Sequence, residues 1–347
     1  MVLSEIFLKI PYKIVWNTLK VFNKNKDIVF YCADYLDYVI FEEIRKHVPE
    51  ITIVAKNKKV KKELELEGID SILWPVFPKA LIMARHAFHY FPEKQITKIG
   101  LRHGVYHFKK FISAKKYNRF DLYLFTSETE VEEAKALGIT CGASGGFPKI
   151  DGMFKSDKED INKQTRKELN FDNRPIVMFS ATWDKSNSSA IDRWYNRLDQ
   201  LTEKYNVLVT LHPWVSEQFK NTIRNTKNVY LIDDKRTLKY LMLSDVFIGD
   251  TSSIIAEFCS LDKPIITFKV DDNNNRLDSS IVEMLKKISE RIDTFDQLEY
   301  AIELSLKNPN KLSPERMKYN NIMFDKLDGF HGKKSAEKIL TFLNKKN

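Results

Sequence analysis

The chain has 347 residues, of which 43% are hydrophobic and 30% charged, so it suits two soluble globular domains and is not a disordered polymer. No apolar run reaches the ~18 to 20 residues that cross a bilayer, and no signal peptide with a small-residue cleavage site is present. The net charge of +9 indicates an anionic partner, which could be a phosphate-rich substrate, an acidic lipid or nucleic acid.

The first predicted element is an amphipathic helix over residues 1–24. Its apolar residues recur at roughly helical spacing, and four lysines interleave with them: Lys9, Lys13, Lys20 and Lys24. Trp16 would act as an interfacial anchor, and Pro11 is expected to break or kink the helix. This pattern is typical of a helix on an anionic membrane surface. A helix packed on the protein's own core is the alternative.

Alternating strands and helices follow. Over residues 25–150 the expected strands are 27–35, 51–56, 96–104 and 121–127, with helices over 36–47 and 130–139. The Gly- and Pro-rich residues 142–154 mark a boundary. In a second domain over 151–330, a helix at 162–171 precedes strands at 175–183, 206–214, 228–233, 245–253 and 264–270. Residues 331–347 predict a C-terminal helix that could pack back on the first domain. Each domain should be a doubly wound parallel sheet.

Several chemistries lack their sequence signatures. There is no GxxxxGK[ST] loop, no GxGxxG after the first strand and no Asp-x-Asp. The three cysteines are odd in number and widely spaced, which argues against a zinc or disulfide framework and fits a reducing cytoplasm. His86 and His89 share a helical face, but nothing nearby completes a site. We therefore expect neither a metal ion nor a bound cofactor.

The strongest chemical signal lies in GDTSSIIAEF, residues 249–258. An apolar strand ends at Gly249 and Asp250, and the next helix opens with three hydroxyl residues: Thr251, Ser252 and Ser253. Hydroxyls and free N–H groups at a helix N-terminus favour phosphate, and ligands bind at the carboxyl ends of parallel strands. An ordinary N-cap is the alternative, but it needs fewer hydroxyls. Glu257 could reach a ribose or could be a solvated helix residue.

Two histidines each follow a predicted strand. In RHGV (102–105), His103 is placed where chemistry occurs, and Gly104 lets the backbone approach a ligand. In LHPW (211–214), His212 precedes a proline that stops the strand. Each motif alone is weak, but both histidines would look into one cleft if the domains face each other.

Further loops carry candidate phosphate contacts. Thr182 and Lys185 follow the strand 175–183, and Lys149 and Lys333 are predicted to be exposed cations. Each of these residues could equally belong to an ordinary solvated loop or surface.

Six motifs occur in register, and together they resemble the CDP-glycerol glycerophosphotransferase family, the primases and polymerases of wall teichoic acid and related capsule polymers. They are GLRHG, GFPKID, SATWDKS, LHPWV, the segment LKYLMLSDVFIGDTSSIIAEFCSLDKPIITF, and DGFHGKKSAEKI. The resemblance covers about residues 96–340. It implies the GT-B fold, in which two Rossmann-like doubly wound domains face a central cleft.

The resemblance also implies roles for individual residues. His103 matches a general base, His212 a residue that stabilises the diphosphate, and Thr182 the family's ATW segment. The phosphate-binding segment is matched by Asp250, Ser252 and Ser253, and the family's C-terminal DG segment by Asp328 and Gly329. The chain departs from the family at Arg102, Thr251, Asp184 and Lys185, which leaves donor and acceptor open. Candidate phosphate or acceptor contacts are Arg102, Gly104, Lys149, Lys185, Asp328 and Lys333.

The predicted function is transfer of glycerol phosphate, or a related alditol phosphate, from CDP-glycerol or CDP-ribitol to a lipid-linked or polymer acceptor, with release of CMP. The enzyme would lie on the inner face of the cell membrane and would not bind nucleic acid. One alternative is a GT-B glycosyltransferase or sugar-nucleotide epimerase that uses a UDP-sugar. A second is a non-catalytic basic membrane-binding protein. The alcohol, the acceptor, primase against polymerase activity, metal dependence and oligomeric state stay open.

Overall fold

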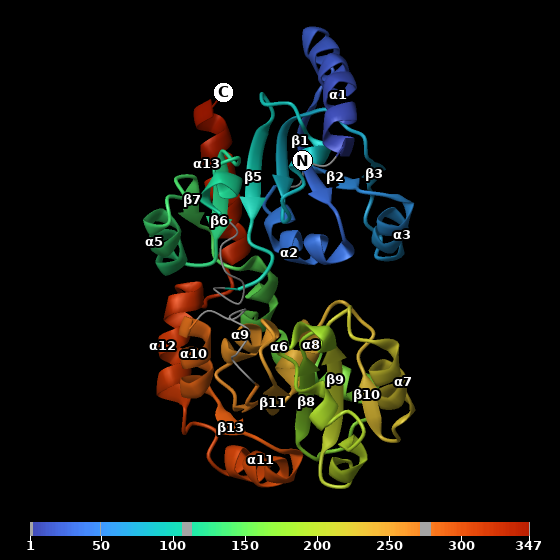
Figure 1. Cartoon of the computed structure of the whole chain (residues 1–347), viewed down its shortest axis with the longest axis vertical. Helices are drawn as coiled ribbons and strands as arrows, with labels where there is room; N and C mark the ends of the chain where they lie inside the picture. The colour runs from blue at the N-terminus through green and yellow to red at the C-terminus, as the bar shows by residue number, and fades with distance from the viewer. Residues whose placement is uncertain (1–2, 49, 106–112, 271–278, 347) are drawn as a thin grey trace. The chain divides into compact units, whose positions relative to one another are not determined.

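The computed structural model describes residues 3–48, 50–105, 113–270 and 279–346, which form two compact units (Figure 1). The N-terminal unit comprises Met1–His103, Phe111–Asp151 and Phe330–Asn347, and the C-terminal unit comprises Gly104–Lys110 and Gly152–Gly329.

The N-terminal unit contains a parallel sheet of seven strands in the order β3-β2-β1-β4-β5-β6-β7. Its strands are β1 (Lys26–Cys32), β2 (Thr52–Ala55), β3 (Ile72–Leu73), β4 (Pro78–Met83), β5 (Thr97–Leu101), β6 (Leu122–Phe125) and β7 (Gly142–Ser144). The chain builds outward from β1 to β3, returns to place β4 beside β1, and then builds the other way. The strand order therefore reverses between β1 and β4, which confirms a doubly wound sheet.

The helices of this unit are α1 (Leu3–Val21), α2 (Tyr35–Arg45), α3 (Lys58–Leu66), α4 (Ala114–Tyr117), α5 (Glu128–Ala136) and α13 (His331–Lys346). Polar residues at their N-termini explain where several begin. Asn57 caps α3 by accepting from Val60 N, and Ser127 caps α5 by accepting from Glu130 N.

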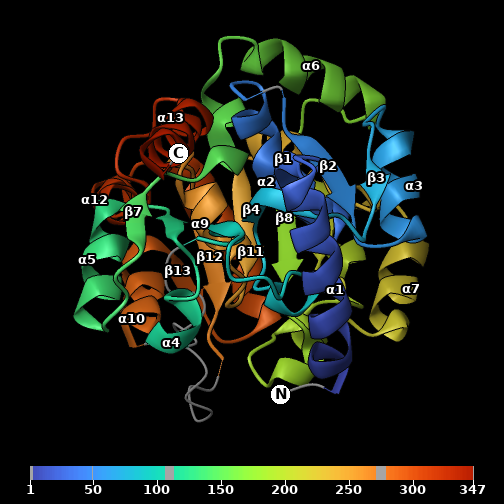
Figure 2. The same ribbon diagram turned by 90° about the horizontal axis from the view of Figure 1, so that it is seen from above.

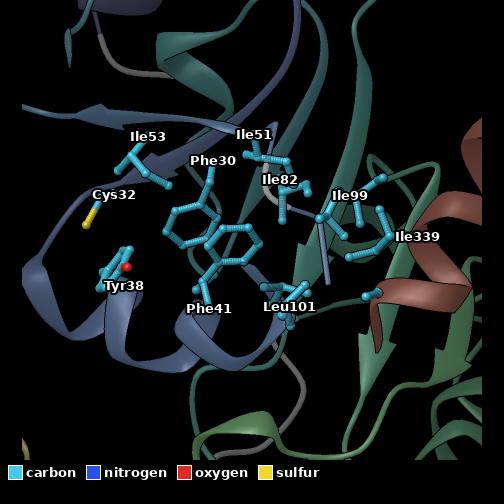
Figure 3. Close-up of a cluster of buried hydrophobic side chains, with 14 of the residues drawn as sticks. Phe30, Cys32, Tyr38, Phe41, Ile51, Ile53, Ile82, Ile99, Leu101 and Ile339 are labelled. Carbon is cyan, nitrogen blue, oxygen red and sulfur yellow. The ribbon is translucent and has the colours of Figure 1, made fainter. Parts of the chain in front are cut away.

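One face of this sheet packs on α2 and α13. Phe30 of β1 and Phe41 of α2 stack with ring centroids 4.0 Å apart, and Ile339 of α13 packs in the same cluster as Ile99 of β5 (Figure 3). Truncating such a buried phenylalanine typically costs about 3–5 kcal/mol. The C-terminal helix, red in Figure 1, thus helps to form the core of the N-terminal unit.

Helix α1 packs on the opposite face through one stripe. The Tyr12 hydroxyl donates to Val76 O at 2.6 Å, and the Trp16 indole donates to Pro78 O at 2.8 Å, with both side chains buried. The prediction that Trp16 is an interfacial anchor is therefore wrong, because its ring is part of the core. Pro11 lies inside the continuous helix and does not break it.

The C-terminal unit contains a parallel sheet of six strands in the order β10-β9-β8-β11-β12-β13; the run from β13 through β12 and β11 to β8 can be followed in Figure 2. Its strands are β8 (Ile176–Ala181), β9 (Asn206–Leu211), β10 (Val229–Leu231), β11 (Val246–Gly249), β12 (Ile265–Phe268) and β13 (Glu290–Ile292). The order reverses between β8 and β11. This is the second predicted doubly wound sheet, and its four central strands, β8, β9, β11 and β12, are buried on both faces, as is usual for parallel sheets.

The helices of this unit are α6 (Lys158–Glu168), α7 (Glu217–Asn225), α8 (Leu238–Leu243), α9 (Ile254–Cys259), α10 (Ser279–Ile288), α11 (Leu298–Lys307) and α12 (Ser313–Phe324). Short 3-10 turns include η2 (Pro148–Phe154), which begins in the N-terminal unit, and η3 (Asp184–Ser186). Within the described parts of both units, no helix combines the length and apolarity needed to cross a bilayer.

Candidate active site

The carboxylate of Asp250 organises the carboxyl ends of β8 and β11. It accepts hydrogen bonds from Thr182 N at 3.1 Å, Ala190 N at 3.1 Å and Thr251 N at 2.5 Å. The side chain is buried, and burial raises the pKa of Asp250 while these amides oppose the rise. The structure therefore gives Asp250 an organising role in place of the direct phosphate contact that the family resemblance implied.

Two hydroxyl groups form further hydrogen bonds within the loops that follow β8 and β11. The buried Thr251 hydroxyl donates to Ser188 O at 3.0 Å, and the Ser189 hydroxyl donates to Thr182 O at 3.1 Å. Thr251 is thus held in the protein's own network, unlike the two serines that follow it. Thr182 presents a half-buried side chain at the end of β8.

Ser252 and Ser253 stand at the start of α9. Ser253 occupies the N-cap position, yet its side chain makes no capping hydrogen bond, so the ordinary N-cap explanation does not apply to it. Neither serine hydroxyl has a hydrogen-bond partner among the described residues, and both side chains are half-buried. These hydroxyls can therefore donate to a ligand at the point where the sheet order reverses. Glu257 is buried, so it is not a solvated helix residue.

His212 follows β9, the strand on the other side of β8. Its Nδ1 accepts from Trp214 N at 3.2 Å, so the neutral imidazole carries its proton on Nε2 and can donate from there. The exposed Trp214 ring lies edge-on to His212 and to Trp183, with centroids 5.3 and 5.5 Å apart. Asp184 joins the loops after β8 and β9 by accepting from Ser216 N and Oγ at 3.0 and 2.7 Å.

His103 lies in the N-terminal unit, exposed in the bend directly after β5. The residue before it is buried: Arg102 Nε lies 2.9 Å from Glu130 Oε1, and Arg102 Nη1 donates to Tyr117 OH at 2.9 Å. Arg102 N also donates to Leu124 O. These contacts favour a structural role for Arg102, which anchors the chain beneath His103, over the predicted phosphate contact.

The remaining candidate contacts are divided between the units. Half-buried Lys149 and exposed Lys333 belong to the N-terminal unit, and exposed Lys185 and half-buried Asp328 to the C-terminal unit. Asp328 pairs with Lys326 at 3.3 Å. At Gly104 a Cβ atom would meet no described atom within 4 Å, so packing does not require a glycine there.

Two of the motifs quoted above, GFPKID (146–151) and DGFHGKKSAEKI (328–339), contact each other. Asp151 accepts from His331 N at 3.1 Å and Gly332 N at 2.6 Å, and His331 Nδ1 lies 3.3 Å from Phe147 O. The Ser335 hydroxyl donates to Gly145 O at 2.9 Å. Residues 145–151 therefore hold the first turn of α13, residues 331–335, in place. The sequence analysis missed this structural role because it assigned residues in both motifs to phosphate contacts.

A second missed feature lies where the N-terminal sheet reverses. Arg85 follows β4 and binds Asp37 at the start of α2, with Nε–Oδ1 at 2.7 Å. The signal was the short apolar run ALIM (80–83), which is followed by Ala-Arg-His. Among the described residues, no group of three or more His, Cys, Asp or Glu is arranged to hold a metal ion.

These two doubly wound units define the class as GT-B. The fold is similar to that of the wall teichoic acid polymerase TagF, with TM-score 0.68 and 16% identity over 97% of this chain and 98% of that one. It is also similar to UDP-GlcNAc 2-epimerase from Neisseria meningitidis, with TM-score 0.58 and 13% identity over 92% of this chain and all of that one. At such identities these likenesses show the fold alone.

The sequence comparison is more specific. The family described as CDP-Glycerol:Poly(glycerophosphate) glycerophosphotransferase matches residues 18–345, and the chain belongs to this family. A relative is the teichoic acid glycerol-phosphate primase of Bacillus subtilis, 28% identical over 169 residues. That match spans 45% of this chain and 42% of the primase, so less than half of the relative's length is covered.

Proposed function

We propose that this protein transfers glycerol phosphate, or a related alditol phosphate, from a CDP-alcohol to a hydroxyl of a lipid-linked or polymer acceptor. The observation that carries the proposal is the pair of unpartnered hydroxyls, Ser252 and Ser253, at the carboxyl edge of the C-terminal sheet. Membership of the glycerophosphotransferase family supports the same reaction.

In the proposed step the acceptor hydroxyl attacks the β-phosphorus of the CDP-alcohol. A new phosphorus–oxygen bond forms, the bond from that phosphorus to the bridging oxygen breaks, and CMP leaves with the bridging oxygen. His103 would accept the proton of the attacking hydroxyl, since an exposed imidazole can act as a base near neutral pH. Ser252, Ser253 and the Nε2–H of His212 would donate to the diphosphate and offset its developing charge.

The test is release of CMP by purified protein given CDP-glycerol or CDP-ribitol and a short glycerol phosphate polymer as acceptor. We expect acceptor-dependent release with one of the donors and a fall in kcat of about 10² to 10⁴ in His103→Ala. His47→Ala is the matched control, because His47 is another exposed histidine of the N-terminal unit. Near-normal turnover in His103→Ala would remove its role as base.

The donor site is tested separately. Ser252→Ala combined with Ser253→Ala should raise the KM for the CDP-alcohol by about 100-fold or more, because two hydrogen bonds to charged oxygens are lost and each contributes about 1.5–3 kcal/mol. Consumption of UDP-GlcNAc, with no CMP released from either CDP-alcohol, would replace this proposal by a sugar-nucleotide reaction.

We also propose that the enzyme works at the inner face of the cell membrane, held there by α1. Ile10, Ile14 and Val21 repeat on one side of α1 and are 61–81% exposed, while Tyr12 and Trp16 occupy its buried side. Exposed lysines accompany the apolar side, which suits a surface of anionic lipid.

A further inference from the structure

The carboxyl edge of the N-terminal sheet carries a guanidinium group at the point where the strand order reverses. Ligands of open α/β sheets bind in the crevice at this point, outside the carboxyl ends of the two strands. In this unit the two strands are β1 and β4. Asp34 and Asp37 follow β1 and Arg85 follows β4, so Arg85 lies where the fold places a ligand.

Asp37 holds this guanidinium in place. Its side chain is 1% exposed, and its Oδ2 accepts from Ala33 N at 3.0 Å and Asp34 N at 3.1 Å. Its Oδ1 accepts from Arg85 Nε at 2.7 Å. Burial raises the pKa of Asp37, and the charge of Arg85 opposes that rise. The carboxylate is thus engaged through both oxygens, which fixes the orientation of the guanidinium.

Arg85 keeps donors available beyond this pair. Its side chain is 45% exposed, and Asp37 is its hydrogen-bonding partner among the described residues. The two terminal nitrogens, Nη1 and Nη2, therefore present N–H groups to solvent. A guanidinium fork of this kind matches two oxygens of a phosphate.

A second cation lies at the same edge. Lys56 follows β2, the neighbour of β1; it is exposed, and its backbone N–H donates to Cys32 O at 3.0 Å. Its ammonium lies 5.8 Å from the ring centroid of Tyr90. The one further acid after β1, Asp34, is engaged as the N-cap of α2, where it accepts from Leu36 N.

We infer that Arg85, oriented by Asp37, binds a phosphate group of the acceptor and that Lys56 adds to the positive potential around it. This inference rests on the proposed function, which requires an acceptor made of phosphodiesters or carrying a lipid-linked phosphate. Arg85 is a binding residue in this scheme and takes no part in proton transfer. Asp37 is a positioning residue, because it acts through Arg85.

A purely structural ion pair is the competing explanation, and a matched pair of variants separates the two. Lys79 of β4 pairs with Asp27 of β1 at 2.8 Å and is 50% exposed, at the amino end of the same two strands. Arg85→Gln and Lys79→Gln each remove one positive charge beside the β1–β4 pair. Arg85 lies at the carboxyl ends of these two strands, and Lys79 lies at their amino ends. Since Arg85→Gln leaves Asp37 buried without its partner, the double variant Arg85→Gln with Asp37→Asn restores a neutral pair.

The measurement is the KM for a short glycerol phosphate acceptor and for the CDP-alcohol. We expect Arg85→Gln and the double variant to raise the acceptor KM roughly 10- to 100-fold, the cost of losing hydrogen bonds to a charged group, with the donor KM unchanged. Arg85→Lys should recover only part of the loss, because an ammonium lacks the fork. Lys79→Gln should match the wild type. Equal effects of Arg85→Gln and Lys79→Gln, or a shift in thermal unfolding alone, would overturn the inference.

A direct binding measurement tests this inference independently of the proposed reaction. Glycerophosphoglycerol, the smallest glycerol phosphodiester, is titrated by calorimetry into wild type, Arg85→Gln and Lys79→Gln, without any donor. Binding lost in Arg85→Gln alone supports the subsite even if no CMP is ever released. Equal binding to all three proteins, or none to the wild type, overturns it. If Arg85→Gln instead weakens binding to anionic vesicles but not to the soluble diester, Arg85 contacts a lipid headgroup and the acceptor assignment is wrong.

Discussion

At the scale of single residues, two buried aspartates perform comparable tasks. Asp37 and Asp250 each lie where a sheet reverses, and each accepts hydrogen bonds from backbone amides of the loops there. A buried carboxylate is costly unless it is hydrogen-bonded, so each fixes the loops around it. They differ because Asp37 also binds Arg85. The N-terminal unit therefore has a cation where its strand order reverses, and the C-terminal unit has the hydroxyls of Ser252 and Ser253 there.

His86 gives a pH-dependent stability. Its ring packs edge-on against Phe88, Tyr117 and Phe120, and burial, with a smaller contribution from Arg102, lowers the pKa of His86 to about 4 from 6.5. Since the folded pKa lies below the unfolded one, the unfolded chain binds the proton more readily in this window. The unfolding free energy should therefore fall as the pH drops from about 6.5 to about 4 and should not depend on His86 above that range.

The comparison is between wild type and His86→Phe, which keeps an aromatic ring but does not titrate. Apparent melting temperatures are measured at about pH 7.5 and about pH 5, on either side of the unfolded pKa. The wild type should lose more stability at the lower pH than His86→Phe does. His47→Phe, at an exposed histidine, controls for the added ring. The same pH dependence in wild type and His86→Phe would show that His86 does not contribute.

At the scale of elements, the contact between residues 145–151 and the first turn of α13 joins two short segments that are far apart in the sequence. Asp151, His331 and Gly332 join positions about 180 residues apart in sequence. Gly146 lies directly under the His331 ring: its φ is +78°, and a Cβ there would lie 2.4 Å from that ring. The helix is therefore fitted to the loop after β7 by shape as well as by hydrogen bonds.

Gly146→Ala should destabilise the N-terminal unit by about 2–4 kcal/mol, because the alanine meets both a left-handed backbone and the His331 ring. Gly68→Ala is the matched control, since Gly68 has a φ of +71° but no atom within 4 Å of its Cβ position. That variant should cost about 1 kcal/mol from backbone strain alone. Chemical denaturation measures both. Similar losses would mean that the His331 contact is unimportant.

Sequence patterns predicted the strands whose apolar runs are continuous and missed those that are short or begin with a breaker. The strands that contain VFYC and IVMFSA, which are buried on both faces, were predicted. Strand β4 was missed, because it begins at Pro78 and is followed by an aromatic segment whose residue spacing resembles a helical face. Because β4 was not predicted, Arg85 was not recognised as a residue at the carboxyl end of a strand. The hydroxyl loop at 251–253 was found because its chemistry is local in sequence.

Contacts across long separations could not be predicted in the same way. The motifs containing Lys149 and Lys333 look like exposed cationic loops locally, and nothing in either segment states that it packs on the other. Likewise, burial of Arg102 depends on Glu130 and Tyr117, which lie on α5 and α4. Residue type indicates chemistry, but tertiary packing decides whether the group is available.

At the scale of the whole molecule, α1 packs on the protein's own core, which was one of the two alternatives left open by the sequence, and it also has an exposed apolar side. Tyr12 and Trp16 fasten it to the N-terminal unit, and the opposite side exposes Ile10, Ile14 and Val21. A helix that served only to cover the core would gain nothing from apolar side chains in water. The division into one docked and one exposed apolar side supports the proposed attachment of α1 to a membrane surface.

The prediction is that the purified protein sediments with vesicles of anionic phospholipid and much less with zwitterionic ones, and that salt weakens the binding. Ile14→Glu should reduce the partition coefficient by tenfold or more, because burying one such side chain contributes about 1.5–3 kcal/mol. Leu66→Glu is the control, since Leu66 of α3 is 78% exposed but lies outside α1. If Leu66→Glu weakens binding as much as Ile14→Glu, binding depends on the overall charge of the protein and not on the apolar side of α1. If neither vesicle binds the protein, the proposal that α1 holds the enzyme at the membrane is wrong.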